Sequence, residues 1–381
     1  MRVLILSCAT GGGHNDAARG AAQALTAAGH EAVLLDHYLG MAGGAVDTAV
    51  CQGYVETVRH APKAFRALYG IGRGASTGFY KLGVPSPVYW ANIGLAGKLE
   101  ALLAQEHFDA VVMTHLFPAQ TLTYLRHKGA AVPLTVAVAT DYTSIPFWEE
   151  TDCDWYMVPD TDTAADFVRR GVPAAKLLPM GIPAPAAFDT GFDRAAVRAA
   201  LGFAPDKKYI LVMGGSMGAG DLPGLVRRLR REMGENCRLE VLTGTNRAMH
   251  ETLSKAWAGD KAVCIHDKLG IAAPYMQAAD LLFTKPGGLT STECILSRVP
   301  TVLLDPLSQC EDANRAALTK HNCALAPKGT QARVYWGLRL MNSPAACARM
   351  RAAQAACLPQ NPALALVDFL REQTGEKEAS L

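Results

Sequence analysis

An alternation of short apolar runs with alanine-rich stretches is the feature that most constrains the fold of this chain. The first run, Val3–Ser7, precedes the helix-forming stretch Asn15–Ala28, which ends at Gly29, a residue typical of the position after a helix. Further strand-like runs lie at Ala32–Leu35, Ala110–Met113, Leu134–Ala139 and Trp155–Val158. Such an alternation predicts a parallel sheet with helices on both faces.

The same pattern restarts after a proline-rich break at Gly181–Pro185, where Tyr209–Met213 is the next buried strand. Further strand-like runs follow at Leu239–Leu242, Ala262–Ile265, Leu281–Phe283 and Thr301–Leu304. We therefore expect two Rossmann-like, doubly wound α/β lobes that face a central cleft, with ligands at the carboxyl ends of the strands. The expected division is residues 1–182, residues 183–345, and a helical tail at 346–381 whose position is not predicted.

Composition narrows the class of protein. The 381 residues are 50% hydrophobic and carry a net charge of +2, which excludes a disordered chain and argues against a dedicated nucleic-acid binder. The ten cysteines form no Cys-x-x-Cys pair, as is typical of thiols in a cytoplasmic protein. No apolar run reaches the roughly 18 residues that a membrane-spanning helix needs. The histidines are scattered, so we expect neither a metal nor another cofactor.

A glycine-rich turn, Gly11–Asn15, follows the first strand. Glycines let backbone N–H groups approach a ligand, and the start of the next helix favours negative charge. His14 is placed to act as a general base if its pKa is near the ordinary value; the alternative is a tight turn with an exposed histidine. A nicotinamide site is not favoured, because Asp16 occupies the third glycine position of the G-x-G-x-x-G pattern.

Three further motifs follow later strands. Gly214–Ala219 lies between a strand and an arginine-rich helix, as a diphosphate cradle would. Lys285–Glu293 contains a Pro-Gly-Gly turn and then a helix that we expect to begin near Thr290. Glu293 either completes a capping box or accepts the two hydroxyls of a ribose. Gln309–Asn314 either holds sugar hydroxyls or is a polar loop that opens a helix.

The stretch Cys51–Leu95 fits the alternation poorly. It holds seven aromatic and five basic residues against one acidic residue. That mixture is typical of a membrane-surface contact, in which rings lie at headgroup level and cations meet anionic lipid. The alternative is a helical subdomain whose aromatic rings form a core.

In this order, the four motifs resemble those of the monogalactosyldiacylglycerol synthase and processive diacylglycerol β-glucosyltransferase group of glycosyltransferase family 28, from Val3 to about Leu325. The resemblance implies a GT-B fold with an N-terminal acceptor lobe and a C-terminal UDP-sugar lobe. It implies an inverting transfer without a bound metal, with His14 as the base and Asp141 orienting His14 or the acceptor. The residues implied for donor binding are Gly13, Gly215, Ser216, Ile265, Gly288, Thr290, Glu293, Gln309, Glu311 and Asn314.

Two departures from the family pattern concern substrates. Ile145 stands where the family often has a histidine, and an isoleucine cannot shuttle a proton or donate to a phosphate. The donor-sugar segment carries Cys310 and lies one residue out of register, which leaves glucose, galactose or another hexose open.

The sequence therefore predicts a cytoplasmic hexosyltransferase that is peripheral at the inner face of the cell membrane. We expect UDP-glucose or UDP-galactose as donor, diacylglycerol or a related lipid as acceptor, an anionic membrane surface as partner, and no nucleic acid. The alternatives are an N-acetylglucosaminyltransferase for lipid-linked peptidoglycan precursor, a UDP-sugar 2-epimerase, and a non-catalytic binder of UDP-sugars.

Overall fold

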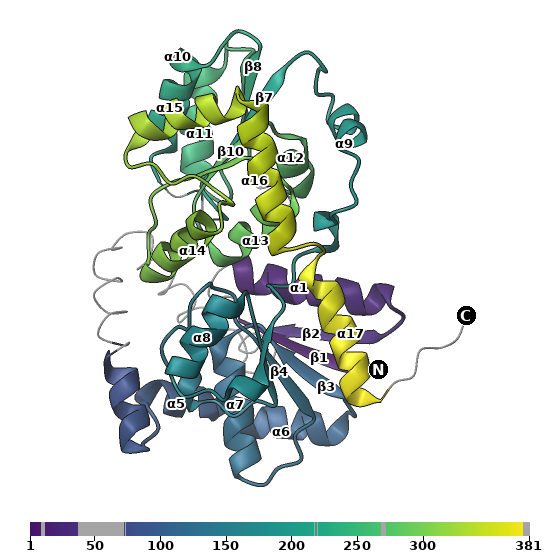
Figure 1. Ribbon diagram of the computed structural model, residues 1–381. Coiled ribbons are helices and arrows are strands. Elements are labelled where there is room, and N and C mark those ends of the chain that lie inside the picture. Colours follow the sequence, from purple (N-terminus) through teal and green to yellow (C-terminus); the bar gives the residue numbers. More distant parts are fainter. Residues whose placement is uncertain are drawn as a thin grey trace. The chain divides into compact units, whose positions relative to one another are not determined.

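A computed structural model describes residues 1–8, 12–36, 72, 74–216, 218, 220–267 and 272–375 (Figure 1). The chain divides into two compact units. Unit 1 comprises Met1–Ala186, Ser308–Cys310 and Pro362–Leu381, and unit 2 comprises Ala187–Leu307 and Glu311–Asn361. Each unit contains one parallel sheet, which confirms the predicted fold class of two α/β lobes.

Unit 1 is built on a six-stranded parallel sheet of order β2-β1-β3-β4-β5-β6. Its strands are β1 Arg2–Ser7, β2 Glu31–Asp36, β3 Ala110–Met113, β4 Leu134–Val138, β5 Trp155–Val158 and β6 Leu177–Pro179. In register, Leu4 of β1 pairs with Val33 of β2 on one side and with Val111 of β3 on the other. The direction of winding reverses between β1 and β3, and the carboxyl edge at such a reversal is where ligands bind in sheets of this kind.

Helices cover both faces of this sheet because the side chains of β1 alternate between two apolar clusters. Val3 and Ile5 pack with residues of α1 and α17, whereas Leu4 and Leu6 pack with residues of α6 and α7. The α-helices of unit 1 are α1 Gly12–Ala27, α5 Pro87–Asn92, α6 Ala96–Gln105, α7 Leu116–His127, α8 Thr161–Arg169 and α17 Pro362–Thr374. The chain thus returns to unit 1 for its last helix.

Unit 2 contains a five-stranded parallel sheet of order β11-β10-β7-β8-β9, whose winding reverses between β7 and β10. Its strands are β7 Lys208–Met213, β8 Cys237–Leu242, β9 Val263–His266, β10 Leu281–Thr284 and β11 Thr301–Leu303. The helices are α9 Arg194–Ala200, α10 Leu222–Glu232, α11 Arg247–Trp257, α12 Ala273–Ala278, α13 Gly288–Leu296, most of α14 Gln309–Lys320, α15 Thr330–Met341 and α16 Pro344–Cys357. Ile210, Val212 and Phe283 lie at the centre of its core.

The aromatic and basic stretch Cys51–Leu95 is described in part, because residues 51–71 and residue 73 lie outside the described residues. The described part contains a helical segment, 74–82, followed by α5 and a 3-10 helix, Ile93–Leu95. Within the ranges that the structure describes, no helix has the length and apolar character needed to cross a bilayer.

Candidate active site

Three neighbouring strands of unit 1 end at one edge of the sheet, and polar residues follow each of them. His14 lies in the first turn of α1 after β1, His115 follows β3, and Asp141 follows β4. All three line a cavity of about 10 Å³, room for about one water molecule. The fold therefore brings His14 and Asp141 together, as their expected shared role requires.

Two hydrogen bonds fix the His14 ring. Its Nδ1 atom lies 3.0 Å from the carbonyl oxygen of Thr114 and 2.9 Å from Oγ1 of Thr140. Because a carbonyl can only accept, Nδ1 carries the proton and Nε2 keeps a lone pair. Burial lowers the pKa of His14 to about 4, although the bond to Thr114 opposes this shift. The ring is therefore neutral at physiological pH, with a pKa well below the ordinary value that the sequence suggested.

His115 is a second imidazole in this cavity that sequence reasoning missed. Its ring meets that of His14 edge-on, with the ring centroids 4.6 Å apart. It is almost fully buried, and its Nδ1 accepts a hydrogen bond of 3.2 Å from the backbone N–H of Phe117 at the start of α7. The available signal was its position directly after an apolar run, which is the same signal that drew attention to His14.

Threonines and apolar side chains form the rest of the cavity wall. Ile145 and Trp148 line it together with Leu116 and Ala139. The loop that carries Ile145 is held in place because Asp166 accepts hydrogen bonds of 2.9 Å from Oγ1 of Thr143 and from the backbone N–H of Ser144. Ile145, at the position of the family histidine, thus adds apolar surface to the cavity.

In unit 2, the glycine-rich turn after β7 depends on its glycines. Gly215 and Gly218 have φ angles of 71° and 57°, which L side chains rarely adopt. A Cβ atom on Gly218 would lie 2.0 Å from the carbonyl oxygen of Thr243. The exposed Ser216 accepts, through its carbonyl oxygen, hydrogen bonds of 2.9 and 3.1 Å from the backbone N–H and Oγ1 of Thr245. The turn is therefore pinned against the loop that follows β8.

A buried cation lies beside this turn. Lys285, which follows β10, donates from Nζ to Oε1 of Glu311 at 3.0 Å, and its Cε atom would lie 3.3 Å from a Cβ atom on Gly215. The other oxygen of Glu311 accepts from the backbone N–H of Leu307 at 2.7 Å. Sequence reasoning treated Lys285 as part of a turn, although a lysine directly after a buried strand was a signal for an anion site.

Helix α13 begins at Gly288, two residues before the expected start. Its N-cap is Gly287, which makes no side-chain capping bond, so Thr290 lies inside the first turn and a Thr290–Glu293 capping box is excluded. Thr290 and Glu293 are both half-buried and share one face of the helix at the i,i+3 spacing.

The remaining predicted donor residues lie at the edges of these elements. Asn314 of α14 is fully buried, and its Nδ2 atom donates to the carbonyl oxygen of Pro286 at 3.0 Å, which supports the turn before α13. Gln309 begins α14, Ile265 lies on β9, and Gly13 lies in the first turn of α1. Within unit 2, the structure therefore brings Gly215 and Glu311 to a common neighbour, Lys285.

Two comparisons relate the sequence of this chain to known enzymes. Residues 14–184 match the sequence profile of the monogalactosyldiacylglycerol (MGDG) synthase family. The chain is 25% identical over 329 residues to a processive diacylglycerol beta-glucosyltransferase of Bacillus mycoides (strain KBAB4), which covers 85% of this chain and 81% of the relative.

Two solved structures show the fold. Acinetobacter baumannii MurG matches with a TM-score of 0.61 and 15% identity over 97% of this chain and 99% of that one. The UDP-GlcNAc 2-epimerase of Neisseria meningitidis matches with a TM-score of 0.61 and 11% identity over 98% of this chain and 100% of that one. Because a transferase and an epimerase match equally well, the fold does not separate these two activities.

The comparisons confirm the resemblance to the monogalactosyldiacylglycerol synthase and processive diacylglycerol β-glucosyltransferase group, and with it the GT-B fold class. They also confirm the predicted class of enzyme, a hexosyltransferase similar to glycosyltransferase family 28.

Proposed function

We propose that this enzyme transfers a hexose from a UDP-sugar to the hydroxyl of a lipid, with diacylglycerol as the acceptor. The observation that carries the proposal is the His14 ring, which is held at Nδ1 and placed at the carboxyl edge of unit 1, so that Nε2 keeps its lone pair. Because burial lowers the pKa of His14 to about 4, the ring is a weaker base than an ordinary imidazole, and its position rather than its basicity supports the role. This edge lies in the part of the chain that matches the MGDG synthase profile, and the Bacillus mycoides relative is named for diacylglycerol glucosylation.

In the proposed reaction, Nε2 of His14 takes the proton of the lipid hydroxyl as its oxygen attacks the anomeric carbon. The new C–O bond forms opposite the bond to UDP, which breaks with its electron pair on the diphosphate, so the configuration inverts. The Thr114 carbonyl keeps the ring in the tautomer that can accept this proton, because a carbonyl can only accept, and the Thr140 hydroxyl lies beside the same Nδ1 atom. Asp141 lines the same cavity and orients the attacking hydroxyl.

The donor binds to unit 2 in this proposal. Backbone N–H groups of the Gly215 turn and the ammonium of Lys285 stabilise the charge that develops on the diphosphate, so the transfer requires no metal ion. Glu293 accepts the ribose hydroxyls from the exposed side of α13, and the backbone at Ile265 meets the uracil. The Lys285–Glu311 ion pair places the lysine before the donor arrives, which lowers the cost of ordering it on binding.

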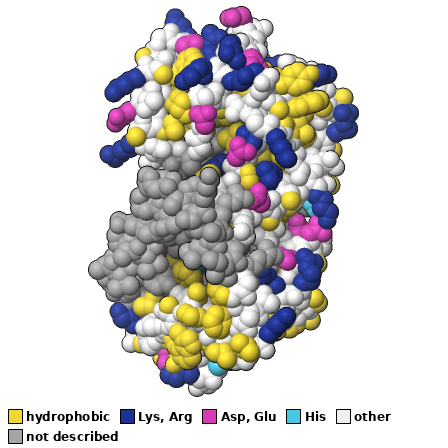
Figure 2. All heavy atoms as spheres, turned by 90° about the vertical axis from the view of Figure 1, so that its left-hand side faces the viewer, with side chains coloured by type: hydrophobic (Ala, Val, Ile, Leu, Met, Phe, Trp, Pro, Cys, Tyr) yellow, Lys and Arg dark blue, Asp and Glu magenta, His cyan; other side chains and the backbone are white. Residues whose placement is uncertain are grey.

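In this proposal, the enzyme binds its lipid acceptor at a membrane surface. The segment 80–90 supports this part of the proposal. Tyr80, Leu82, Val84 and Trp90 are exposed and available for contact with a membrane, whereas Tyr89 is buried. Figure 2 shows hydrophobic side chains gathered on this side of unit 1. Exposed rings and aliphatic side chains next to basic residues such as Lys81 fit peripheral contact with anionic lipid at the cytoplasmic leaflet.

The test is release of UDP from UDP-glucose, UDP-galactose and UDP-N-acetylglucosamine, with and without diacylglycerol in anionic vesicles, with the products identified by mass. We expect lipid-dependent release with one hexose donor and a hexosyl-diacylglycerol product. Conversion of UDP-N-acetylglucosamine to its 2-epimer without a lipid product would favour the epimerase. Tight UDP binding with no turnover on any donor would favour the non-catalytic binder.

A further inference from the structure

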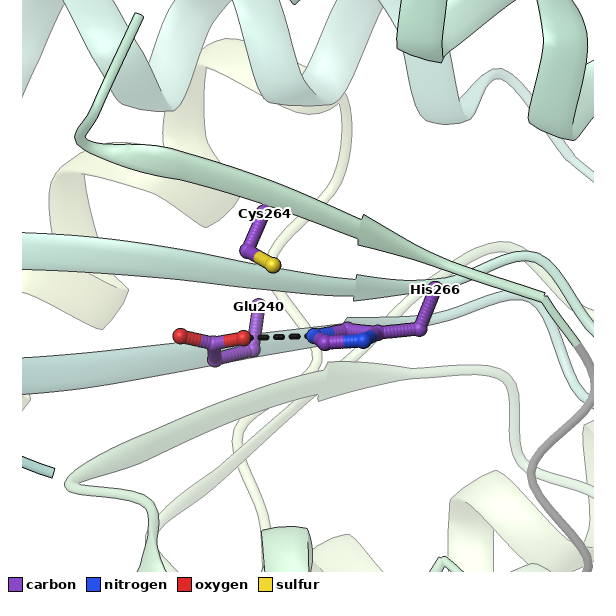
Figure 3. A group of neighbouring side chains, drawn as sticks. All are labelled: Glu240, Cys264 and His266. Atoms are coloured by element: carbon purple, nitrogen blue, oxygen red, sulfur yellow. Dashed lines mark hydrogen bonds and ion pairs between the residues drawn. The ribbon is translucent and has the colours of Figure 1, made fainter. Parts of the chain in front are cut away.

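Three side chains that the proposed reaction does not use meet on one face of the sheet of unit 2. Edge strand β9 carries Cys264 and His266, two residues apart and so on the same face. The neighbouring strand β8 carries Glu240, which is the register partner of Cys264. Figure 3 shows the thiol and the imidazole turned toward the Glu240 carboxylate.

The three ligand atoms lie close to the spacing of a tetrahedral metal site, but the hydrogen bond between Glu240 and His266 must open to admit an ion. Nε2 of His266 lies 2.6 Å from Oε2 of Glu240, and one ligand atom from each of the three residues lies within 4.8 Å of the other two. Zinc binds sulfur at about 2.3 Å and nitrogen or oxygen at about 2.0–2.1 Å, which sets its ligand atoms roughly 3.3–3.6 Å apart. Small rotations of these side chains would therefore admit the ion.

The surroundings of the three groups favour a cation. Glu240 is a nearly buried carboxylate in the middle of a strand, where an acid is costly unless it is paired. The Cys264 thiol belongs to the register partner of Glu240 on the neighbouring strand. A divalent cation would bind both groups, and the Tyr275 ring, whose centroid lies 5.1 Å from that of His266, packs against the imidazole and limits its movement.

The type of metal follows from the donor atoms. Sulfur, imidazole nitrogen and one carboxylate are the ligands of zinc, whereas magnesium and calcium require a set of oxygen ligands. Cys264 is exposed, so an ion has a route of entry and water can take a fourth position. The sequence did not reveal the cluster, because Glu240 precedes His266 by 26 residues and joins it only through strand pairing.

We propose that Glu240, Cys264 and His266 form a binding site for Zn²⁺ or a similar borderline-soft divalent cation, which holds the edge strand β9 against β8. This site takes no part in the sugar transfer, so its test requires neither donor nor acceptor. On binding, the Cys264 thiol releases its proton to solvent and ligates as the thiolate.

The experiment uses the full chain, freed of metal with a chelator that is then removed, and titrates it with Zn²⁺, Co²⁺ and Mg²⁺. We expect about one Zn²⁺ per chain, a thiolate-to-cobalt absorption band with Co²⁺, and no saturable binding of Mg²⁺. Cys264→Ser should abolish the band and weaken Zn²⁺ binding at least about tenfold. Cys357→Ser is the control, because Cys357 is a half-exposed thiol of unit 2 that contacts Cys323 and lies outside the cluster, and it should bind as the parent does.

Two further variants keep the test independent of folding. His266→Gln and Glu240→Gln should each weaken Zn²⁺ binding while the circular dichroism spectrum of the metal-free protein stays that of the parent. In addition, Zn²⁺ should raise the melting temperature of the parent and of Cys357→Ser more than that of Cys264→Ser. The proposal is overturned if the parent chain binds no Zn²⁺, or if Cys264→Ser retains the cobalt band or the parent affinity.

Discussion

In the sequence, glycines follow the first strand of each unit, but the described residues near these points differ in chemistry. In unit 1, His14 lines a small cavity and is a buried, neutral histidine with a strongly lowered pKa. In unit 2, the turn lies against the Lys285–Glu311 ion pair. One architecture thus provides a place for proton transfer in one unit and a place for anionic charge in the other. Variants in each unit test this difference in chemistry.

The largest expected effect is a fall in turnover when the proposed base of unit 1 is removed. His14→Ala should lower kcat about 10²–10⁴-fold, the usual contribution of a general base, and leave the Kd for UDP close to that of the parent. Turnover with vesicle-borne diacylglycerol and calorimetric titration with UDP measure the two quantities. His107→Ala removes a histidine whose side chain is 90% exposed and should leave kcat unchanged. A His14→Ala enzyme with near-normal turnover would remove this residue from the role.

The second effect concerns the cation in unit 2. Lys285→Ala should weaken UDP binding by about 10–100-fold and also destabilise the protein, because Glu311 would lose its charged partner in a nearly buried place. The double variant Lys285→Met/Glu311→Gln should recover the stability but not the affinity. Lys255→Ala, on the exposed part of α11, serves as control. Full UDP affinity in the double variant would show that Lys285 has a purely structural function.

The third prediction tests whether the turn of unit 2 needs its glycine for space as well as for conformation. Gly202 and Gly218 both have positive φ, but a Cβ atom on Gly202 meets nothing within 4 Å. Gly202→Ala should therefore cost only the backbone strain, about 1 kcal/mol of unfolding free energy. Gly218→Ala should cost clearly more, because the new methyl group collides with the Thr243 carbonyl. Urea unfolding of both variants gives the comparison, and equal losses would contradict it.

The smallest expected effect concerns the pH at which the His14 ring takes up a proton. Because the pKa of His14 is lowered to about 4, the ring stays neutral as pH falls from 7 to about 5 and gains its proton only near pH 4. The Cε1 proton resonance of His14, identified by its loss in His14→Gln, should move with a midpoint near 4. A midpoint near the ordinary 6.5 for His14 would mean that water reaches the ring.

The local pattern of apolar runs in the sequence predicted both sheets well. Most of the features that it did not predict depend on contacts between residues far apart in the sequence. Both lobes follow from apolar runs and their turns, but β6 was not predicted because its three residues, Leu177–Pro179, are short, only partly buried and end in proline. The contact between His14 and His115 joins residues 101 apart, and only the strand order β1-β3 explains it. The low pKa of His14 depends on burial, which a single motif does not encode.

The Lys285–Glu311 ion pair of unit 2 was not predicted from the sequence for a similar reason. The motif containing Lys285 and that containing Glu311 were both recognised, but their ion pair depends on how the loop after β10 meets the start of α14. The expected start of α13 was two residues late because the Thr-x-x-Glu spacing resembled a capping box, whereas the Pro-Gly-Gly turn already leads into the helix at Gly288.

The return of α17 to unit 1 has a consequence for synthesis of the chain on the ribosome. Leu366 and Leu370 of α17 are fully buried in the cluster that contains Val3 and Ile5 of β1, so β1 waits for a helix that is synthesised after all of unit 2. Unit 2 can complete its core before α17 emerges, whereas unit 1 keeps an apolar face uncovered until that helix is available. In a nascent chain stalled before residue 362, the uncovered face of unit 1 should therefore bind chaperones better than unit 2 does.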